Sequence, residues 1–482
     1  MSRGIGLKQK SVAAALAALL LSSCTTTDSS LENTTPASAG AAQAPSGSSA
    51  TQSKPIPAAS SHQKGGKAVD GNNLTLEQAV QIAVNWHPSI DEAVGKINQN
   101  TAEIGVARAG YYPKVKGGIG SSYSSEYSGE WQPRLNVSAS QMVYDFGKVS
   151  GSVDVRTAAT NVSRAQLLMG VDILIRETAS AVIEIQRYQA LLAVAREQHR
   201  GVKAIASLVG ERSDKGASTK SDQVQAEARV VAAESTILEI SGQLKRWEST
   251  LADLLGRPGA IKVASNVPQW LQNTCSAAEP DWTKAPGVLQ AQAQKEEALA
   301  QLKVARAEIF PTLSLDASSG YDFNQGSNRN RSSDDPSLKV GLNVSGNLYN
   351  GGATIANRNA ANYGLTAAEA AIRNSRLEIA SSLTQARSQT SSIQQLLGSL
   401  KTRSAMMSQT RDLYRQQYVE LGTRTLLDLL NAEQELHQAA FDAANSTHDL
   451  RKLGVECMFN SGRSRELFAL ENVKVRGMEL RL

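Results

Sequence analysis

The pattern of hydrophobic and polar positions changes its period several times along the chain. In four stretches apolar residues alternate with polar ones, which is the period of a β-strand with one apolar and one polar face. Each stretch has about ten residues, the length of a transmembrane strand, although a soluble sheet packed on one face shows the same alternation. We therefore expect strands at residues 114–123, 135–144, 312–321 and 338–348, with a loop around residues 131–133 before the second strand.

The first stretch with helical spacing precedes these strands. Residues 76–112 are predicted to be helical, with Thr75 as the N-cap and an interruption near His87 and Pro88. Pro113 ends this helix, because proline lacks the backbone N–H that a helix interior needs.

Two later helices are predicted to be very long, because no proline interrupts them. They cover residues 147–210 and 352–421 and have about 64 to 70 residues each, or about 100 Å at 1.5 Å per residue. Each ends in a glycine turn and returns through a shorter helix, at residues 219–256 and 425–458. Helices of this length imply coiled-coil packing. They are too evenly polar to cover an apolar sheet, which favours strands that face lipid.

The same order of elements occurs twice in the chain. The glycine turns show this best, because the second follows the first by about 200 residues and repeats its residue types at the same spacing. We interpret this as a tandem duplication, with a first repeat at residues 74–270, a linker at 271–284, a second repeat at 285–462 and a tail at 463–482. The matching turn residues are Gly216, Thr219, Asp222, Ala226 and Glu227 in the first repeat, and Gly422, Thr425, Asp428, Ala432 and Glu433 in the second.

The N-terminal residues have the pattern of an export signal. A basic start precedes an apolar run at residues 12–21 that is too short to span a bilayer. Leu21-Ser22-Ser23-Cys24 resembles the bacterial lipobox, in which residues 1–23 are removed and the cysteine is acylated, with palmitate among the attached chains. Thr25 follows Cys24, as in lipoproteins sorted to the outer membrane. An ordinary signal peptide with a chance cysteine is the alternative.

Residues 24–73 are predicted to be a flexible tether. They are rich in Ser, Thr, Ala, Gly and Pro and contain few large apolar side chains. Such a segment buries too little surface to offset the entropy lost on ordering. The tether would link an acylated Cys24 to the folded part of the chain.

Composition and charge exclude several classes of function. Hydrophobic residues make up 41% of the chain but aromatic residues only 5%, which suits elongated helices better than one round core. The formal net charge of +5 does not call for nucleic acid. The five histidines show no metal spacing, and His437 and His448 are expected to be solvated. No phosphate-binding glycine loop or nucleophile elbow occurs, so we expect no enzyme, no metal and no cofactor beyond the lipid on Cys24.

Two other cysteines remain, in what should be an oxidising compartment. Cys275 lies in the linker and Cys457 near the end of the last long helix. The loop at residues 257–284, which carries Cys275, and Cys457 both lie about 35 residues up a helix from a turn, which places them at a similar height of about 50 Å. A disulfide and two free thiols both remain open.

Four strands are too few to close a membrane barrel, and open sheet edges are not tolerated in lipid. If the strands enter a membrane, the chain must therefore oligomerise. Two copies would supply eight strands around an interior filled by side chains. Three copies would supply twelve strands and leave room for a passage.

The chain resembles the TolC-like outer membrane factor family from about residue 74 to residue 462. The resemblance rests on the duplicated order of elements and on local motifs, each of which is weak by itself. The motifs are Val106-Ala107-Arg108-Ala109 and Val304-Ala305-Arg306-Ala307 before Pro113 and Pro311, Tyr144-Asp145-Phe146-Gly147 and Tyr349-Asn350-Gly351-Gly352 after the second strand of each repeat, and the run from Leu421 to Asp428 at the second turn.

The resemblance implies an α+β membrane protein that assembles as a homotrimer. Each chain would contribute four strands to a twelve-stranded β-barrel, which a long α-helical coiled-coil barrel continues. The implied function is a passive exit duct in the bacterial outer membrane that docks on a periplasmic adaptor protein and an inner membrane pump of the RND or ABC class. Multidrug efflux and type I secretion both remain open. A structural or adhesive coiled-coil lipoprotein is the alternative, but it does not explain four amphipathic strands.

The resemblance also assigns a periplasmic gate to the glycine turns. By position, Asp428 matches a ring of aspartates around the threefold axis, and Arg424 and Asp222 match residues that constrict the tunnel. Asn431 stands where better-known members carry a second aspartate, so we expect one ring instead of two. Each aspartate also follows a threonine by three residues, which fits a capping box. A gate role and helix capping therefore both remain open.

Overall fold

The computed structural model describes residues 73–123, 131–259, 261–276, 280–322 and 337–480. The predicted signal peptide, Cys24 and the tether up to residue 72 lie outside these described residues. Residues 69–482 form one compact unit, to which the following description is confined. Among the described helices, none is both long and apolar enough to cross a membrane.

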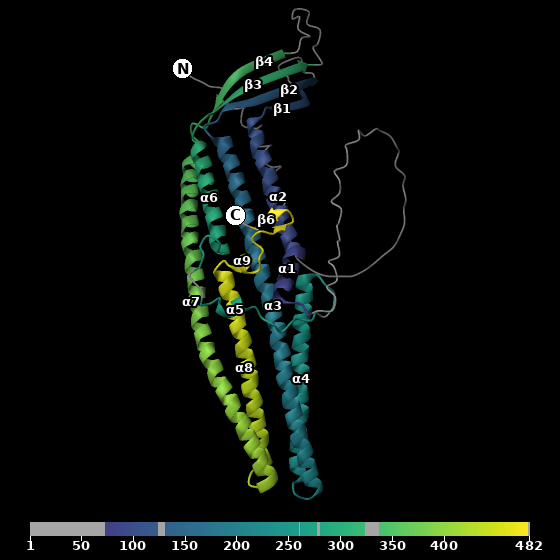
Figure 1. Ribbon diagram of the computed structural model, residues 1–482. Helices are drawn as coiled ribbons and strands as arrows, with labels where there is room; N and C mark the ends of the chain where they lie inside the picture. Colours follow the sequence, from purple (N-terminus) through teal and green to yellow (C-terminus); the bar gives the residue numbers. More distant parts are fainter. Residues whose placement is uncertain (1–72, 124–130, 260, 277–279, 323–336, 481–482) are drawn as a thin grey trace, which may run out of the picture. The chain divides into compact units, whose positions relative to one another are not determined.

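The helices and strands follow the predicted duplicated order (Figure 1). The first half contains α1 (Leu76–Trp86), α2 (Pro88–Arg108), the 3₁₀ turn η1 (Ala109–Tyr111), β1 (Lys114–Tyr123), β2 (Trp131–Tyr144), α3 (Lys148–Asp214) and α4 (Lys220–Leu255). The second half contains α5 (Gln269–Asn273), α6 (Pro286–Ala307), β3 (Thr312–Asp322), β4 (Ser337–Ser345), α7 (Ala353–Gln416), the π-helical turn η2 (Gln417–Leu421) and α8 (Leu426–Asn460). After these come α9 (Ser464–Leu467), β5 (Lys474–Val475) and β6 (Met478–Glu479).

The first helix begins and breaks where the sequence predicted. The Thr75 side chain accepts a hydrogen bond from the backbone N–H of Gln78, and the Gln78 side chain accepts one from the backbone N–H of Thr75. His87, in an extended conformation, separates α1 from α2, and Pro88 occupies the first turn of α2. Proline is tolerated there because the first helical N–H has no intrahelical partner.

The four long strands form one antiparallel sheet in the order β1-β2-β3-β4. The predicted loop at residues 131–133 is wrong, because β2 already begins at Trp131. Within the described residues, β2 pairs at this end with β1, and its pairing with β3 starts at Arg134. Among the described strands Pro133 therefore has a neighbour on one side, and a strand edge is where proline is tolerated. The fourth strand ends at Ser345, three residues earlier than predicted, because Ser345 pairs with Thr312 and Pro311 precedes that residue.

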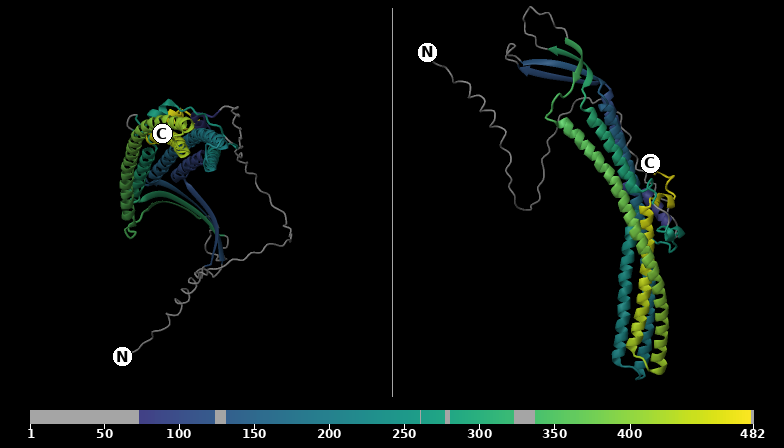
Figure 2. Two further views of the ribbon diagram at one scale, coloured as in Figure 1. Left: turned by 90° about the horizontal axis from the view of Figure 1, so that it is seen from below. Right: turned by 90° about the vertical axis from the view of Figure 1, so that its left-hand side faces the viewer.

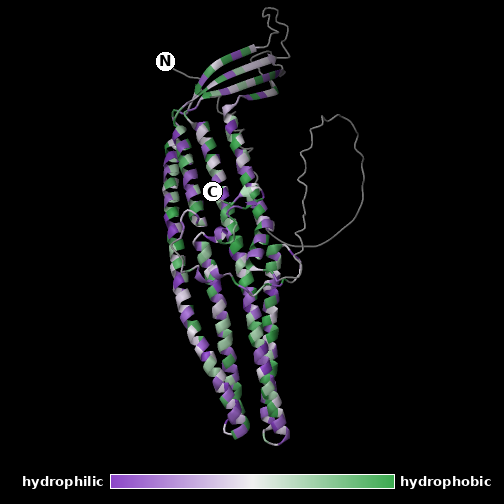
Figure 3. Cartoon of the chain, viewed as in Figure 1, coloured by the Kyte–Doolittle hydropathy of each residue, from purple (hydrophilic) through white to green (hydrophobic). Residues whose placement is uncertain are grey.

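One face of this sheet is apolar and uncovered. The sheet extends beyond the ends of α2, α3, α6 and α7, and no described helix lies over it (Figures 1 and 3). Large apolar side chains on this face stay at least 63% exposed, namely Val115, Ile119, Leu338, Val340, Leu342 and Val344. An isolated sheet does not leave so much apolar surface in water, so this face requires an apolar surrounding.

The main core lies around the middle of α3, where the expectation of evenly polar helices is wrong. All of residues 181–186 are buried, because α1, α2, α4, α6 and α8 pack around this helix. The helices run side by side in the views of Figure 2. By contrast, α7 buries only Ile379, Leu383, Ala386 and Leu400 along its 64 residues. The two repeats therefore share their elements but not their environment.

Residues 463–482 were predicted only as a tail, yet the described part of this segment belongs to the core. Phe468 is 1% exposed and Trp270 packs against its ring edge-on, at 5.4 Å between centroids. The buried Arg465 guanidinium lies 3.3 Å from the Asp172 carboxylate of α3 and donates to the backbone oxygens of Lys284 and Leu480. The C-terminal segment thus fastens the end of α8 to α3 and to the linker.

Candidate functional site

The two glycine turns are the first candidate site, and they lie together at the end of the helices opposite the sheet (Figures 1 and 2). One turn joins α3 to α4 and the other joins α7 and η2 to α8. A small apolar cluster lies directly behind them and holds the two helix pairs together. It consists of Ile205, Val209, Ala226, Tyr418, Leu426, Leu429 and Leu430.

Gly216 reverses the chain in the first turn. Its φ of +72° lies in the left-handed region, which glycine adopts without a steric cost. Thr219 then caps α4: its hydroxyl oxygen accepts from the Asp222 N–H at 3.1 Å, and an Asp222 carboxylate oxygen accepts from the Thr219 N–H at 3.1 Å. The Ser218 hydroxyl donates to the same carboxylate at 3.0 Å. Asp222 is thereby fixed at the helix start.

Gly422 has the same role in the second turn, with a φ of +60°. The preceding residues form the π-helical turn η2, and the Thr423 N–H donates to the Gln417 carbonyl at 3.2 Å. Thr425 and Asp428 repeat the capping box, and the Thr425 hydroxyl also donates to the Asp428 carboxylate at 2.9 Å. The capping boxes predicted at both turns are therefore present.

The hydrogen bonds of these boxes stabilise the charged form of both aspartates. The pKa of Asp222 is lowered mainly by the bond from the Thr219 N–H. The pKa of Asp428 is lowered mainly by the bond from the Thr425 hydroxyl, with a smaller contribution from the positive charge of Arg424. Both carboxylates are ionised at neutral pH, and Asp428 keeps 39% of its side chain exposed. Capping therefore leaves Asp428 free to act on a neighbouring charge.

Arg424 braces the second turn from inside the chain. Its guanidinium lies over the Tyr414 ring at 4.4 Å, and its Nε donates to Gln417 at 3.1 Å. Its nearest contact with Asp428 is 4.0 Å, which is the outer limit of an ion pair. Within the described residues no ion pair joins Arg424 to Asp222. Asn431 is exposed about one turn further along α8.

Arg212 is a residue of this site that the sequence reasoning missed. It lies near the end of α3, and its Nη1 donates across to the Val419 carbonyl of η2 at 3.2 Å. The same guanidinium covers the Tyr418 ring at 4.9 Å and lies 3.5 Å from the Ala217 carbonyl. Arg212 therefore ties the two turns to each other. No local motif marks it, since the Val419 carbonyl and the Tyr418 ring that it contacts are about 200 residues away in the chain.

A buried polar cluster lies behind the turns, and it corrects the prediction that His437 is solvated. His437 is 4% exposed and its Nε2 is 3.0 Å from the Glu433 carboxylate, which is itself 1% exposed. Arg411 of α7 approaches this carboxylate at 3.7 Å. Gly201 of α3 makes room for it, because a Cβ at that position would overlap the carboxylate. Glu433 therefore links three helices.

His448 is also buried, at 4% exposure, so its predicted solvation is wrong too. Its Nδ1 lies 2.8 Å from the Ala444 carbonyl and its Nε2 lies 3.0 Å from Arg451. A carbonyl requires a donor, so the ring carries its proton on Nδ1. Burial is the main cause that lowers the pKa of His448. Both histidines lie on the face of α8 that packs on α3. They are buried because α3 covers this face.

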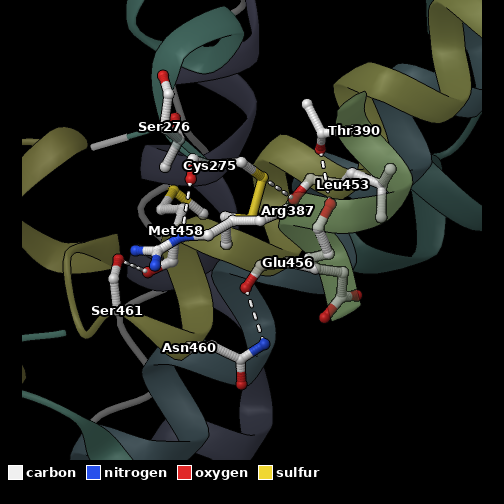
Figure 4. The surroundings of a disulfide bond; sticks show 12 residues. Cys275, Ser276, Arg387, Thr390, Leu453, Glu456, Met458, Asn460 and Ser461 are labelled. Carbon is white, nitrogen blue, oxygen red and sulfur yellow. Dashed lines mark hydrogen bonds between the residues drawn. A yellow bond between two sulfur atoms is a disulfide. The ribbon is translucent and has the colours of Figure 1, made fainter. Parts of the chain in front are cut away.

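The linker carries a second candidate feature. Cys275 and Cys457 form a disulfide that joins it to α8, so of the two alternatives left open by the sequence the structure has the bonded one (Figure 4). The Arg387 side chain of α7 donates to the Cys275 carbonyl at 3.1 Å. Within the described residues, no group of three His, Cys, Asp or Glu side chains is arranged to hold a metal ion.

Comparison with known proteins assigns the family. The model of the outer membrane efflux protein family matches residues 79–257 and 283–452. The chain belongs to the outer membrane efflux protein family. This membership also places the protein in the bacterial outer membrane, as the sequence predicted.

Individual relatives are distant. The pyoverdine export outer membrane protein OpmQ of Pseudomonas putida is 25% identical over 52% of this chain and 56% of its own length. Protein CyaE of Bordetella pertussis is 26% identical over 51% of this chain and 54% of its own length. The chain thus spans a little over half the length of these curated relatives.

A solved structure resembles this chain over a larger share of its length than these two relatives do. The outer membrane protein VceC of Vibrio cholerae superposes with a TM-score of 0.68, covering 80% of this chain and 96% of VceC at 17% identity. At this identity the likeness shows the fold alone. That fold is the mainly helical one, with strands, that the sequence predicted.

Proposed function

We propose that this protein is the outer membrane exit duct of a tripartite export system. The observation that carries the proposal is the four-stranded sheet with an exposed apolar face at one end of helices about 100 Å long. Lipid would cover the apolar face, while the helices reach into the periplasm. The chain itself supplies no energy, binds no cofactor apart from lipid on Cys24, and catalyses no reaction.

Three copies complete this duct. Among the described strands of one chain, β1 and β4 are unpaired edges, and in lipid every strand edge must pair. Edge-to-edge pairing of three chains gives twelve strands, enough to surround a passage. The long helices of the three chains would continue the same threefold arrangement below the sheet.

The two glycine turns form the periplasmic gate in this proposal. Three copies of Asp428 around the axis would attract cations and repel one another. Arg424 and Asp222 act as constricting partners, and Asn431 leaves the mouth with one ring of carboxylates. A periplasmic adaptor protein and an inner membrane pump of the RND or ABC class complete the system. OpmQ is named for the export of pyoverdine. The cargo of the present protein would likewise be a compound exported across the outer membrane.

Ion conductance of the purified protein in a planar lipid bilayer tests the proposal. We expect discrete conductance steps from an oligomer. A structural or adhesive lipoprotein, the alternative function, would bind the bilayer without conducting. Folded oligomer that never conducts, even after the Asp428 charge is removed, would contradict the exit duct.

A further inference from the structure

The polar face of the four-stranded sheet carries unbalanced positive charge. In the antiparallel register, Lys116 pairs with Ser138, Ser138 pairs with Ser318, and Ser318 pairs with Lys339. Directly paired residues point to the same face, so one row across the sheet has a lysine at each edge and serines between them.

The next row adds a third lysine and one carboxylate. Lys114 pairs with Ser140, which pairs with Asp316, and the Ser140 hydroxyl donates to the Asp316 carboxylate at 2.5 Å. Ser314 donates to the same carboxylate at 3.0 Å. The acid is thus held by serines, and no ion pair joins it to a lysine within the described strands.

By sequence this face has one further cation and one further acid, Arg134 and Asp322, whose backbones pair in the register and whose formal charges add to zero. Of the other charged residues, Lys114, Lys116 and Lys339 are exposed and stand against Asp316. The opposite face of the described strands carries no charged residue, so the excess belongs to the polar face alone.

The position of the lysines concentrates this charge when chains assemble. β1 and β4 are the two edges of the sheet, with Lys114 and Lys116 on one and Lys339 on the other. Edge-to-edge pairing therefore places the lysines of one copy and the lysine of its neighbour on adjacent strands. Like charges crowded on a polar lining destabilise the assembly unless anions occupy the space between them.

We propose that this face lines an anion-preferring passage and that the cargo is an organic anion carrying carboxylate or phosphate groups. The inference rests on the proposed exit duct and names its substrate class. Low-dielectric walls concentrate the field of their charges, which raises the local concentration of ions of opposite sign. Screening over about 10 Å at 0.1 M salt still leaves the lysine side chains within reach of a passing solute.

Reversal potentials in a potassium chloride gradient test this inference on the full-length oligomer. The ratio of chloride to potassium permeability in the wild type also includes the cation-attracting Asp428 ring of the proposed gate, so the inference is tested by how substitutions on the sheet change this ratio. Lys114→Gln/Lys116→Gln/Lys339→Gln should lower the permeability ratio of chloride to potassium by roughly three-fold or more at low salt. Asp316→Asn removes the acid between the lysines and should shift the ratio in the opposite direction. Asn136→Gln, on the same face without a change of charge, should leave it unaltered.

Citrate, which carries three carboxylates, serves as the probe for an organic anion. Added on the sheet side, it should reduce the chloride current of the wild type and lose this effect in the triple lysine variant. If that variant does not assemble, Lys116→Gln and Lys339→Gln singly should each give a smaller shift in the same direction. A conducting channel whose ion preference and citrate block ignore all of these lysines overturns the inference but not the exit duct. A wild type that does not conduct overturns the exit duct first.

Discussion

At the residue scale, Asp428 combines two roles that substitution can separate. Asp428→Asn removes the carboxylate charge, whereas Thr425→Val removes the capping hydroxyl and leaves the charge. If three carboxylates face the passage, only Asp428→Asn raises single-channel conductance and weakens block by the trivalent cation hexamminecobalt(III), by several-fold at low salt. Single-channel recording with the cation on the turn side measures both effects.

The Thr425 variant is the control for the Asp428 experiment. It loses a bond to the helix start and should lower thermal stability without changing cation block. If both variants alter conductance alike, Asp428 acts through capping and the gate must be assigned elsewhere.

The buried carboxyl of Asp172 leads to a prediction about how stability depends on pH. Burial raises the pKa of this carboxyl to about 7, and the nearby Arg465 opposes the rise. A carboxyl whose pKa is higher in the folded state binds more protons there, so its contribution to stability is largest below the unfolded pKa of about 4. That contribution falls as the pH rises toward 7, by as much as a few kcal/mol.

Thermal unfolding of the oligomer at pH 5 and pH 8 checks this prediction. The wild type should lose stability between the two, and Asp172→Asn should lose less. Asp91→Asn is the matched control, because Asp91 pairs with Arg476 of the same C-terminal segment at the protein surface, at 2.7 Å. Its profile should follow the wild type. An Asp172→Asn profile equal to the wild type would show that this carboxyl does not titrate in the range.

At the scale of elements, the sequence predicted whatever depends on local chemistry. Thr75, Thr219 and Thr425 identify three helix starts because a capping box needs only residues three apart. The burial of the α3 centre and of His437 could not be predicted this way. Both depend on helices distant in the chain that pack on all sides of α3, and periodicity reports only whether one face of a helix is apolar. The role of Arg212 was not predicted for the same reason.

The disulfide between the linker and α8 predicts how removal of its two cysteines changes stability and proteolysis. Its disulfide closes a chain segment of 182 residues, and a bond that closes so long a segment is worth roughly 2–5 kcal/mol, mainly by restricting the unfolded chain. Cys275→Ser/Cys457→Ser should therefore lower the unfolding temperature by several degrees and speed tryptic cleavage between residues 257 and 284.

The contact from Arg387 to the linker is the internal comparison for the disulfide. Arg387→Gln removes the bond to the Cys275 carbonyl but keeps the disulfide, so its linker should resist trypsin better than that of the double serine variant. Conductance should stay at the wild-type level in both, since the turns lie at the far end of α8. Equal digestion of the wild type and the double serine variant would show that the disulfide does not hold the linker.

At the scale of the whole molecule, α4 presents an unused coiled-coil seam. Val224, Val231 and Leu238 are seven residues apart and 55%, 60% and 73% exposed. Small residues follow each by four positions, namely Ala228, Ser235 and Gly242, so the seam has the heptad spacing of a helix partner and allows close approach. α7 has the complementary excess, with Leu396, Met406 and Leu413 about half exposed. The same helices in one chain do not cover these residues, so a second copy is the partner we expect.

Val231→Glu/Leu238→Glu tests this seam, because two carboxylates placed in a packed apolar interface must lose water without gaining partners. We expect the assembled form, seen as three chains by chemical cross-linking in detergent, to break down to single chains or to require much higher protein concentration. Arg246→Glu, which adds a carboxylate next to the seam on the same helix, should still cross-link to three. A double variant that assembles like the wild type would assign the seam to another partner, such as the adaptor, and the strand edges alone would then hold the three copies together.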